Sequence, residues 1–201
     1  MTSPPTTRDQ IRQVAAALFN QRGFNGTSMA DLAAAVGVTK SSLYHHFPSK
    51  QSLLSEIIDL TVNRVTPLLR EVAESDLPVV ERLHRAIHQH TLEGIRDQDA
   101  QACFMEEGRY LAPDFMAAHV ARRDRYEFIF RNMFEEGIAS GDLLDRDISL
   151  TVKAVLGMCN SAVRWYQPGG DLTPDEIATQ FADLAVRGVT SGPETTMGGA
   201  G

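Results

Sequence analysis

Apolar residues recur at helical spacing along most of the chain, and short polar or glycine-containing stretches interrupt them. The spacing predicts a helix from about residue 7 to residue 22, followed by two short helices between residues 28 and 47. Further helices are predicted at about 49–74, 78–96, 99–111, 113–136, 145–166 and 174–190. The pattern therefore predicts an all-α protein of about nine helices.

The two short helices carry the clearest local signals. Ser28, with Asp31 three residues later, is typical of a helix N-cap, and apolar residues then repeat at helical spacing. Gly37 ends this helix at a position that usually needs positive φ. Thr39 can cap a second helix, which Pro48 ends. This arrangement predicts two helices that cross at a glycine turn.

The second short helix leaves a crowded polar face outward. If its apolar side packs on the first helix, the outward residues are Thr39, Lys40, Ser41, Ser42, Tyr44 and His45. Donors and acceptors on one short helix suit the base edges and phosphates of DNA, so the pattern is typical of a helix-turn-helix recognition helix. Spacing alone is equally compatible with an ordinary αα-hairpin that has a solvated face.

One face of the predicted helix 113–136 combines long polar side chains with aromatic rings and a methionine. Its residues are His119, Arg122, Arg123, Tyr126, Phe130 and Met133. Such a face can line a cavity with a cationic mouth and an apolar interior, as an amphipathic ligand with an anionic head requires. The alternative is that the arginines lie at the rim of a filled core.

The last two predicted helices are each apolar on two sides. Small residues and a methionine mark the second side: Ala154, Met158, Ser161 and Ala162 on one helix, and Ala178, Ala182 and Ala185 on the other. A helix that is apolar on two sides must be covered twice, and small residues let a neighbouring helix approach closely. These faces predict a homodimer that joins through a four-helix bundle.

Composition narrows the class of protein. The chain has 201 residues, of which 43% are hydrophobic and 22% charged, as in ordinary soluble proteins. No apolar run reaches the roughly 20 residues that a membrane span needs, and the first residues lack a signal-peptide core. We therefore expect a cytoplasmic protein with no membrane partner, in which Cys103 and Cys159 are buried and reduced.

Charge is unevenly distributed along the chain. The formal net charge is −7, but residues 1–50 carry +3 and the remainder −10. A basic end on an acidic body allows phosphate contact at one end and discourages unspecific wrapping of DNA.

Catalytic and metal motifs are not apparent. The sequence shows no Ser-His-Asp order, no glycine-rich phosphate loop and no metal cluster. His84 and His88 lie four residues apart, but no third ligand accompanies them. We therefore expect neither an enzyme nor a metal or cofactor site.

The run TSMADLAAAVGVTKSSLYHHFPSKQSLL resembles the signature of the TetR family of one-component transcriptional regulators. The turn glycine, the Leu-Tyr pair, the phenylalanine and the following lysine all stand at the spacing of that signature. The resemblance implies which residues touch DNA. Phosphate contacts are expected from Thr27, Ser28, Lys50 and Tyr44; base-edge or backbone contacts from Thr39, Lys40, Ser41 and Ser42; and either kind from His45.

The resemblance also implies the organisation of the chain. A helix-turn-helix head in residues 1–48 would precede a ligand-binding and dimerisation body in residues 49–190, and residues 191–201 would be a disordered tail. The implied function is that of a ligand-responsive repressor, a homodimer on a palindromic double-stranded operator, released by a small-molecule inducer. An activator, or an interaction module that has lost DNA binding, remains an alternative.

The segment SAVRWYQPGG is similar to the corresponding segment of TetR-family repressors of actinobacterial lipid or sterol catabolism, which respond to acyl-CoA thioesters. In that reading the nucleotide and phosphates would meet Arg164, Trp165, Arg122 and Arg123, while the acyl part would be enclosed by Phe104, Tyr126, Phe130 and Met133. A regulator of drug efflux that senses a planar or cationic aromatic compound is the main rival.

Overall fold

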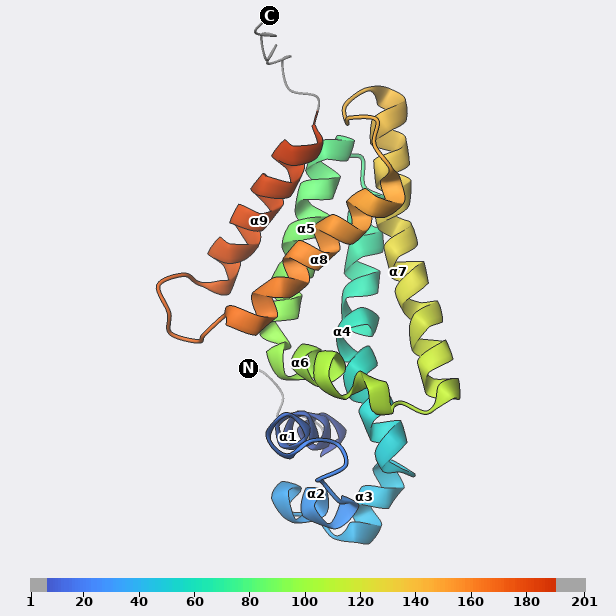
Figure 1. Cartoon of the computed structure of the whole chain (residues 1–201), viewed down its shortest axis with the longest axis vertical. Helices are drawn as coiled ribbons and strands as arrows, with labels where there is room; N and C mark the ends of the chain where they lie inside the picture. The colour runs from blue at the N-terminus through green and yellow to red at the C-terminus, as the bar shows by residue number, and fades with distance from the viewer. Residues whose placement is uncertain (1–6, 191–201) are drawn as a thin grey trace, which may run out of the picture. The chain divides into compact units, whose positions relative to one another are not determined.

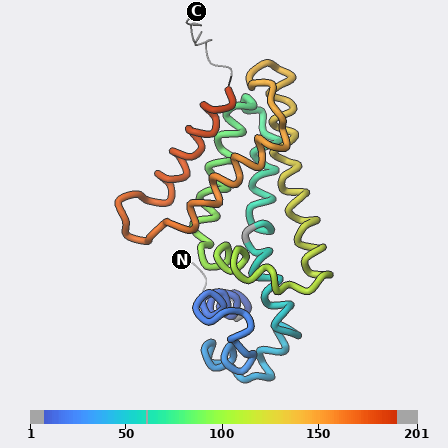
Figure 2. Tube along the Cα trace, viewed as in Figure 1, coloured from blue at the N-terminus to red at the C-terminus, as the bar shows by residue number. Residues whose placement is uncertain are grey.

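The structure is a computed structural model that describes residues 7–190, apart from the side chains of Thr7 and Thr61. Figure 2 traces the chain, and Figure 1 labels its helices. Within the described part there is no strand, only an isolated bridge between Leu143 and Thr190. The prediction of an all-α protein with about nine helices is confirmed. The predicted disordered tail, residues 191–201, lies outside the described residues.

The helices begin and end close to the predicted positions. They are α1 (Thr7–Arg22), α2 (Met29–Val36), α3 (Lys40–His46), α4 (Lys50–Ala73), α5 (Val79–Arg96), α6 (Gln98–Glu107), the 3₁₀ helix η1 (Gly108–Tyr110), α7 (Pro113–Ser140), α8 (Ile148–Trp165) and α9 (Pro174–Val189). Of the helices described, none is both long and apolar enough to cross a membrane.

The chain forms two compact units. Among the described residues, the first comprises residues 7–64 and 97–124, and the second comprises residues 65–96 and 125–190. The division in α4 falls between Arg64 and Val65, close to Pro67, whose missing N–H removes one backbone hydrogen bond of the helix. The predicted domain boundary after residue 48 divides the chain elsewhere and stays a prediction.

The first unit packs α1, α2, α3 and the start of α4 together with α6 and the start of α7. Its core includes the fully buried side chains of Ile11, Phe19, Leu32, Leu43, Phe47, Leu53 and Leu54. Helix α1 contacts both α2 and α6. The three N-terminal helices α1, α2 and α3 therefore share one hydrophobic core with elements that lie far along the sequence.

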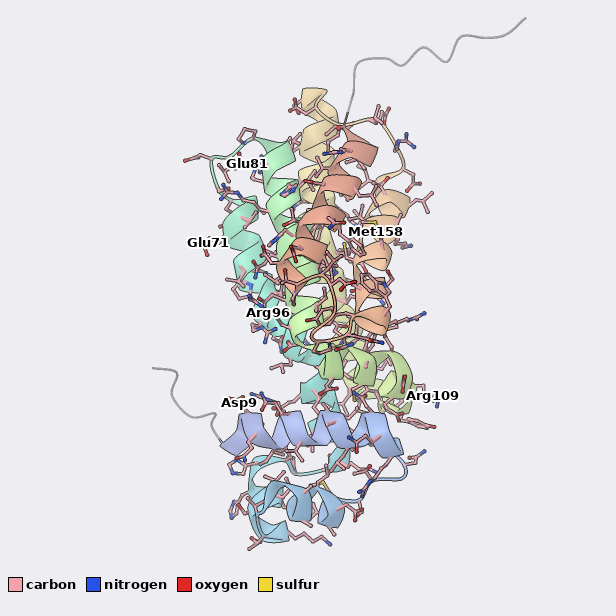
Figure 3. All side chains as sticks on the ribbon, turned by 90° about the vertical axis from the view of Figure 1, so that its left-hand side faces the viewer. Asp9, Glu71, Glu81, Arg96, Arg109 and Met158 are labelled. Carbon is pink, nitrogen blue, oxygen red and sulfur yellow. The ribbon has the colours of Figure 1, made fainter. Side chains whose placement is uncertain are left out.

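The second unit is organised around α5, which contacts both α8 and α9. Its buried residues include Leu83, Ile87, Phe130 and Phe134. Two polar pairs join α5 to α9: the Nε2 atom of His84 lies 2.9 Å from an Asp183 oxygen, and that of His88 lies 3.3 Å from an Asp175 oxygen. Side chains of Glu71 and Glu81, on α4 and α5, lie on the surface (Figure 3).

Candidate nucleic-acid interface and candidate ligand site

Helix α2 begins and ends as its local sequence predicts. The Ser28 hydroxyl accepts a hydrogen bond from the Asp31 amide at 3.1 Å, and the Asp31 carboxylate accepts one from the Ser28 amide at 2.8 Å. Hydrogen bonds from the Ser28 side chain and amide lower the pKa of Asp31. Gly37 ends the helix with φ of 78°, where a side chain would strain the backbone. The predicted capping signals are confirmed.

Helix α3 has one packed side and one exposed side. Thr39 caps it by accepting a hydrogen bond from the Ser42 amide at 3.1 Å. Leu43 and Phe47 are fully buried in the core of the first unit. The exposed side consists of Thr39, Lys40, Ser41, Tyr44 and His45, with Ser42 half-buried beside them. These are the six side chains that the spacing placed outward.

Two residues predicted to contact phosphate are engaged inside the unit instead. Thr27 is buried, and its hydroxyl donates to the carbonyl oxygen of Gly23 at 3.0 Å. The Lys50 ammonium donates to the carbonyl oxygens of Phe24 and Thr27, at 2.6 Å and 2.8 Å, and lies over the Phe24 ring. Burial lowers the pKa of Lys50. The Thr27 hydroxyl faces the chain's own backbone here, and the phosphate contacts of Thr27 and Lys50 stay predictions.

The loop between α1 and α2 is also held by α6. The amide of Phe24 donates to the buried carboxylate of Glu107 at 2.8 Å, and the Phe24 ring stacks on that of Tyr110. The side-chain amide of Gln51 donates to the carbonyl oxygen of Tyr110 at 2.7 Å and accepts from the amide of Ala112 at 3.0 Å. The first turn of α4 thus joins the short helices to the turn before α7.

The predicted ligand residues are divided between the two compact units. Phe104, His119, Arg122 and Arg123 belong to the first unit, whereas Tyr126, Phe130, Met133, Arg164 and Trp165 belong to the second. Six of them lie along α7, as helical spacing predicts. The side chains around these residues differ between the first unit and the second.

In the first unit a buried carboxylate organises the polar residues of α7. Asp59 of α4 accepts a hydrogen bond from Nδ1 of His119 at 2.8 Å, and the Arg122 guanidinium also donates to it. The ring of Phe104 lies 4.7 Å from that of His119. Arg123 is exposed and lies 3.6 Å from the carboxylate of its neighbour, Asp124. Arg122 is therefore ion-paired within the chain, which the face of α7 alone could not indicate.

In the second unit the aromatic residues of α7 contact a half-buried histidine. Nδ1 of His90 lies 2.7 Å from the Tyr126 hydroxyl, and the His90 ring contacts those of both Tyr126 and Phe130. Burial lowers the pKa of His90 to about 4 and raises that of Tyr126 above its usual range. Met133 is also buried. The cluster thus combines the buried side chains of Phe130 and Met133 with this hydrogen-bonded pair.

Arg164 and Trp165 lie elsewhere, at the exposed end of α8. Half of the Trp165 side chain is exposed, and its ring lies 6.1 Å from that of Phe181 on α9. Their predicted contact with a nucleotide stays a prediction.

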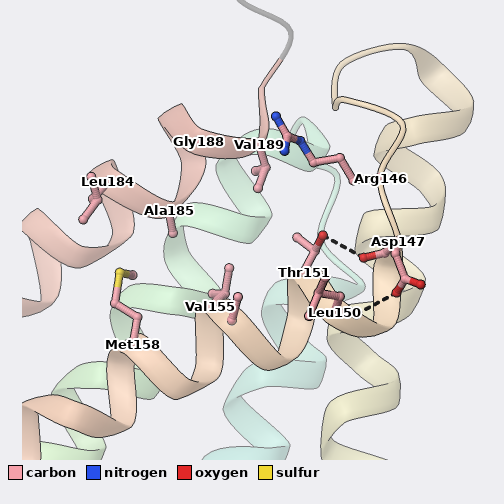
Figure 4. Close-up of a pocket in the computed structure, with 11 residues that line it drawn as sticks. Arg146, Asp147, Leu150, Thr151, Val155, Met158, Leu184, Ala185, Gly188 and Val189 are labelled. Carbon is pink, nitrogen blue, oxygen red and sulfur yellow. Dashed lines mark hydrogen bonds between the residues drawn. The ribbon is translucent and has the colours of Figure 1, made fainter.

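The outer faces of α8 and α9 form an open groove of about 580 Å³ (Figure 4). Asp147 caps α8 at one end of it by accepting a hydrogen bond from the Leu150 amide at 2.7 Å. The groove is lined by Arg146, Asp147, Leu150, Thr151, Ala154, Val155, Met158, Leu184, Ala185, Gly188 and Val189. Leu150 is 68% exposed and Leu184 is 61% exposed, so large apolar side chains stand unburied at this face.

Part of the predicted dimer face is wrong. Ala162, Ala178 and Ala182 are completely buried in the second unit, which leaves them no surface for a partner. Small side chains here allow α9 to pack closely on α5 within one chain. Ala154 and Ser161 are exposed, Met158 is partly exposed, and Ala185 is buried at the floor of the groove. The exposed face therefore keeps three of the predicted positions, Ala154, Met158 and Ser161, and adds Leu150 and Leu184.

Sequence reasoning missed several polar residues that shape these sites. Asp59 lies between apolar residues of α4. A carboxylate at such a position indicates a buried polar partner, which is a signal present in the sequence. Gln51, Glu107 and His90 gave no such signal, because their partners lie 36 to 83 residues away in the chain.

Comparison with known proteins identifies the family. The family described as "Bacterial regulatory proteins, tetR family" matches residues 11–57, and "Tetracyclin repressor-like, C-terminal domain" matches residues 76–189. The HTH-type transcriptional repressor KstR2 of Rhodococcus jostii is 29% identical over 95% of this chain and 98% of its own.

Two solved structures extend the comparison. The TetR family regulator PfmR from Thermus thermophilus is 32% identical, with a TM-score of 0.82 over 89% of this chain and 98% of PfmR. AibR, solved in complex with isovaleryl coenzyme A and operator DNA, is 27% identical, with a TM-score of 0.77 over 92% of this chain and 98% of AibR. These relatives are transcriptional regulators and not enzymes. The chain belongs to the TetR family of bacterial transcriptional regulators.

Proposed function

We propose that this regulator is a ligand-responsive repressor that binds a palindromic operator as a homodimer and leaves it when a small effector binds. The observation that carries the proposal is the exposed polar side of α3, held on a core in which Leu43 and Phe47 are fully buried. A rigid helix with hydroxyl, ammonium, phenol and imidazole groups facing outward has the chemistry to meet base edges and phosphates.

A single α3 helix is too short to define an operator. Its seven residues can reach only a few base pairs, whereas a two-fold dimer reads two half-sites spaced by one turn of DNA or a multiple of it. The outer face of α8 and α9 supports such a dimer, because exposed leucines and a groove occur on the same surface. Covering this face with a second copy would remove Leu150 and Leu184 from water.

The proposed effector is an acyl-CoA thioester. AibR binds isovaleryl coenzyme A, and KstR2 of Mycobacterium tuberculosis is described as a ketosteroid transcriptional regulator. In this chain, the apolar cluster of Tyr126, Phe130 and Met133 offers aromatic and thioether contacts for an acyl group. Planar or cationic aromatic compounds are the rival class.

A mobility-shift assay on the DNA immediately upstream of the protein's own gene tests both parts. The protein should retard this DNA at nanomolar concentration against excess unrelated DNA, and at least one acyl-CoA of a panel should release it. Aromatic cations in the same panel test the rival. Retardation no stronger than that of unrelated DNA would contradict the repressor function, and release by an aromatic cation alone would contradict the effector class.

A further inference from the structure

The carboxylate of Asp59 ties α4 to α7 inside the first unit. Asp59 is 4% exposed and His119 is 3% exposed. One Asp59 oxygen accepts from Nδ1 of His119 at 2.8 Å, while the other accepts from Arg122 and lies 3.4 Å from the hydroxyl of Ser55. We call Asp59, His119 and Arg122 the α4–α7 ionic cluster.

Asp59 remains ionised in this environment. Burial works to raise its pKa, but hydrogen bonds from His119 and Arg122, together with their charge, outweigh burial and lower the pKa. An ionised carboxylate only accepts hydrogen bonds, so Nδ1 of His119 must carry the proton that it shares with Asp59.

The α7 side of the cluster has unused hydrogen-bonding capacity. Nε2 of His119 and Nε of Arg122 are both buried, and neither atom has a hydrogen-bond partner among residues 7–190. Buried polar atoms without partners are uncommon and call for a physical explanation. The Arg122 atom is a donor, and the His119 atom becomes one when the ring is protonated. The Arg122 atom is therefore suited to an acceptor that residues 7–190 do not supply, and the His119 atom is suited to one only when the ring is protonated.

We propose that an anionic group of the effector replaces Asp59 as the partner of Arg122 and His119, and that this exchange frees α4 from α7. The inference rests on the proposed function and concerns how the effector acts. Since the cluster holds one carboxylate and one guanidinium, a second anion beside Arg122 repels Asp59. A buried carboxylate that has lost its partners is strongly destabilised, so α4 must shift to let Asp59 reach water.

A shift of α4 would reach the DNA-reading helices through contacts already described. The first turn of α4 carries Lys50 and Gln51, which hold the loop before α2 and the turn before α7. Asp59 lies on the same helix, nine residues after Lys50. Movement of this helix therefore disturbs the contacts that position α2 and α3.

The anionic group could be a phosphate of a nucleotide thioester or a free carboxylate. Isovaleryl-CoA, coenzyme A and isovalerate separate these sources as probes. Release by isovaleryl-CoA and coenzyme A but not isovalerate assigns the exchange to phosphate, and release by isovalerate assigns it to carboxylate.

The test compares three full-length proteins by fluorescence anisotropy on the operator: wild type, Asp59→Asn, and Asp59→Asn with Arg122→Gln. Asp59→Asn removes the anion that holds Arg122, so it should bind operator about tenfold more weakly than wild type without any effector. The double variant replaces the ion pair with two neutral amides. It should recover most of the operator affinity and lose its response to the probe that releases wild type. Asp114→Asn, an exposed carboxylate in the first turn of α7, is the matched control and should behave as wild type.

The outcomes separate this inference from the proposed function. If wild type itself fails to bind operator, the proposed function is wrong. If wild type binds and is released, but both cluster variants bind and respond as wild type does, the exchange is wrong. If circular dichroism shows that Asp59→Asn does not fold, the double variant alone provides the test. Release of the operator from the double variant by the probe that releases wild type would then overturn the exchange. If no probe releases wild type, the operator affinity of Asp59→Asn without effector provides the test. An affinity equal to that of wild type would overturn the exchange.

Discussion

The polar side of α3 and the polar side of α7 look alike in the sequence but differ in the structure. On α3 the outward residues other than the half-buried Ser42 remain exposed, and of their side chains the Thr39 hydroxyl caps the helix. On α7, His119 and Arg122 turn to a carboxylate of α4, while Tyr126 turns to His90. Helical spacing thus shows which residues share a face, but only the fold shows whether the chain itself occupies that face.

The largest expected effect comes from the packed side of α3. Phe47→Ala removes a fully buried ring from the core shared by α1, α3 and α4, and should lower the free energy of unfolding by about 3–5 kcal/mol. Chemical denaturation followed by circular dichroism measures the change. Tyr44→Ala, on the exposed side of the same helix, is the matched control. Equal losses in the two variants would break the distinction between the two sides.

The half-buried His90 gives the second effect, which depends on pH. Its pKa is about 4 in the folded chain and about 6.5 when unfolded, so between these values only the unfolded chain takes up the proton. Stability should therefore fall as pH falls through this window, by about 2 kcal/mol between pH 7 and pH 5.

His90→Gln keeps a polar side chain near Tyr126 without an ionisable ring. The variant should lose about 2 kcal/mol less than wild type over the same pH range, at matched protein concentration. If the free energy of unfolding falls equally with pH in the two proteins, His90 does not stay neutral in the folded chain. The contrast between its environment and the exposed side of α3 would then be wrong.

The smallest effect concerns the cap of α2. Ser28→Ala removes the hydrogen bond that the Ser28 hydroxyl accepts from the Asp31 amide, and should cost about 1 kcal/mol of folding stability. Ser28→Asp should recover most of this loss, since aspartate also caps helices well. Thermal unfolding of the three proteins gives the comparison. A Ser28→Asp variant as unstable as Ser28→Ala would argue against the cap.

Much of the fold follows from local signals in the sequence. The caps at Ser28 and Thr39, the glycine turn at Gly37 and the apolar stripes place the helices within a few residues. These signals are readable because cap and turn interactions join residues two to four positions apart, so the residues concerned stand close together in the sequence.

The candidate sites are less readable, because their partners are distant. The pairing of Asp59 with His119 spans 60 residues, and that of Phe24 with Glu107 spans 83. The alanines of α9 show a related limit. A small-residue stripe indicates close helix packing, but it does not distinguish a helix of the same chain, here α5, from a helix of a second copy.

The central claim is that the exposed side of α3 reads DNA, and Lys40→Ala combined with Tyr44→Ala tests it most directly. Both side chains are exposed, so the variant should fold with wild-type stability. Operator binding, titrated by fluorescence anisotropy over a range of salt concentrations, should weaken on the order of 100-fold and show a shallower salt dependence. Wild-type affinity with an unchanged salt slope would show that DNA is contacted elsewhere, or not at all.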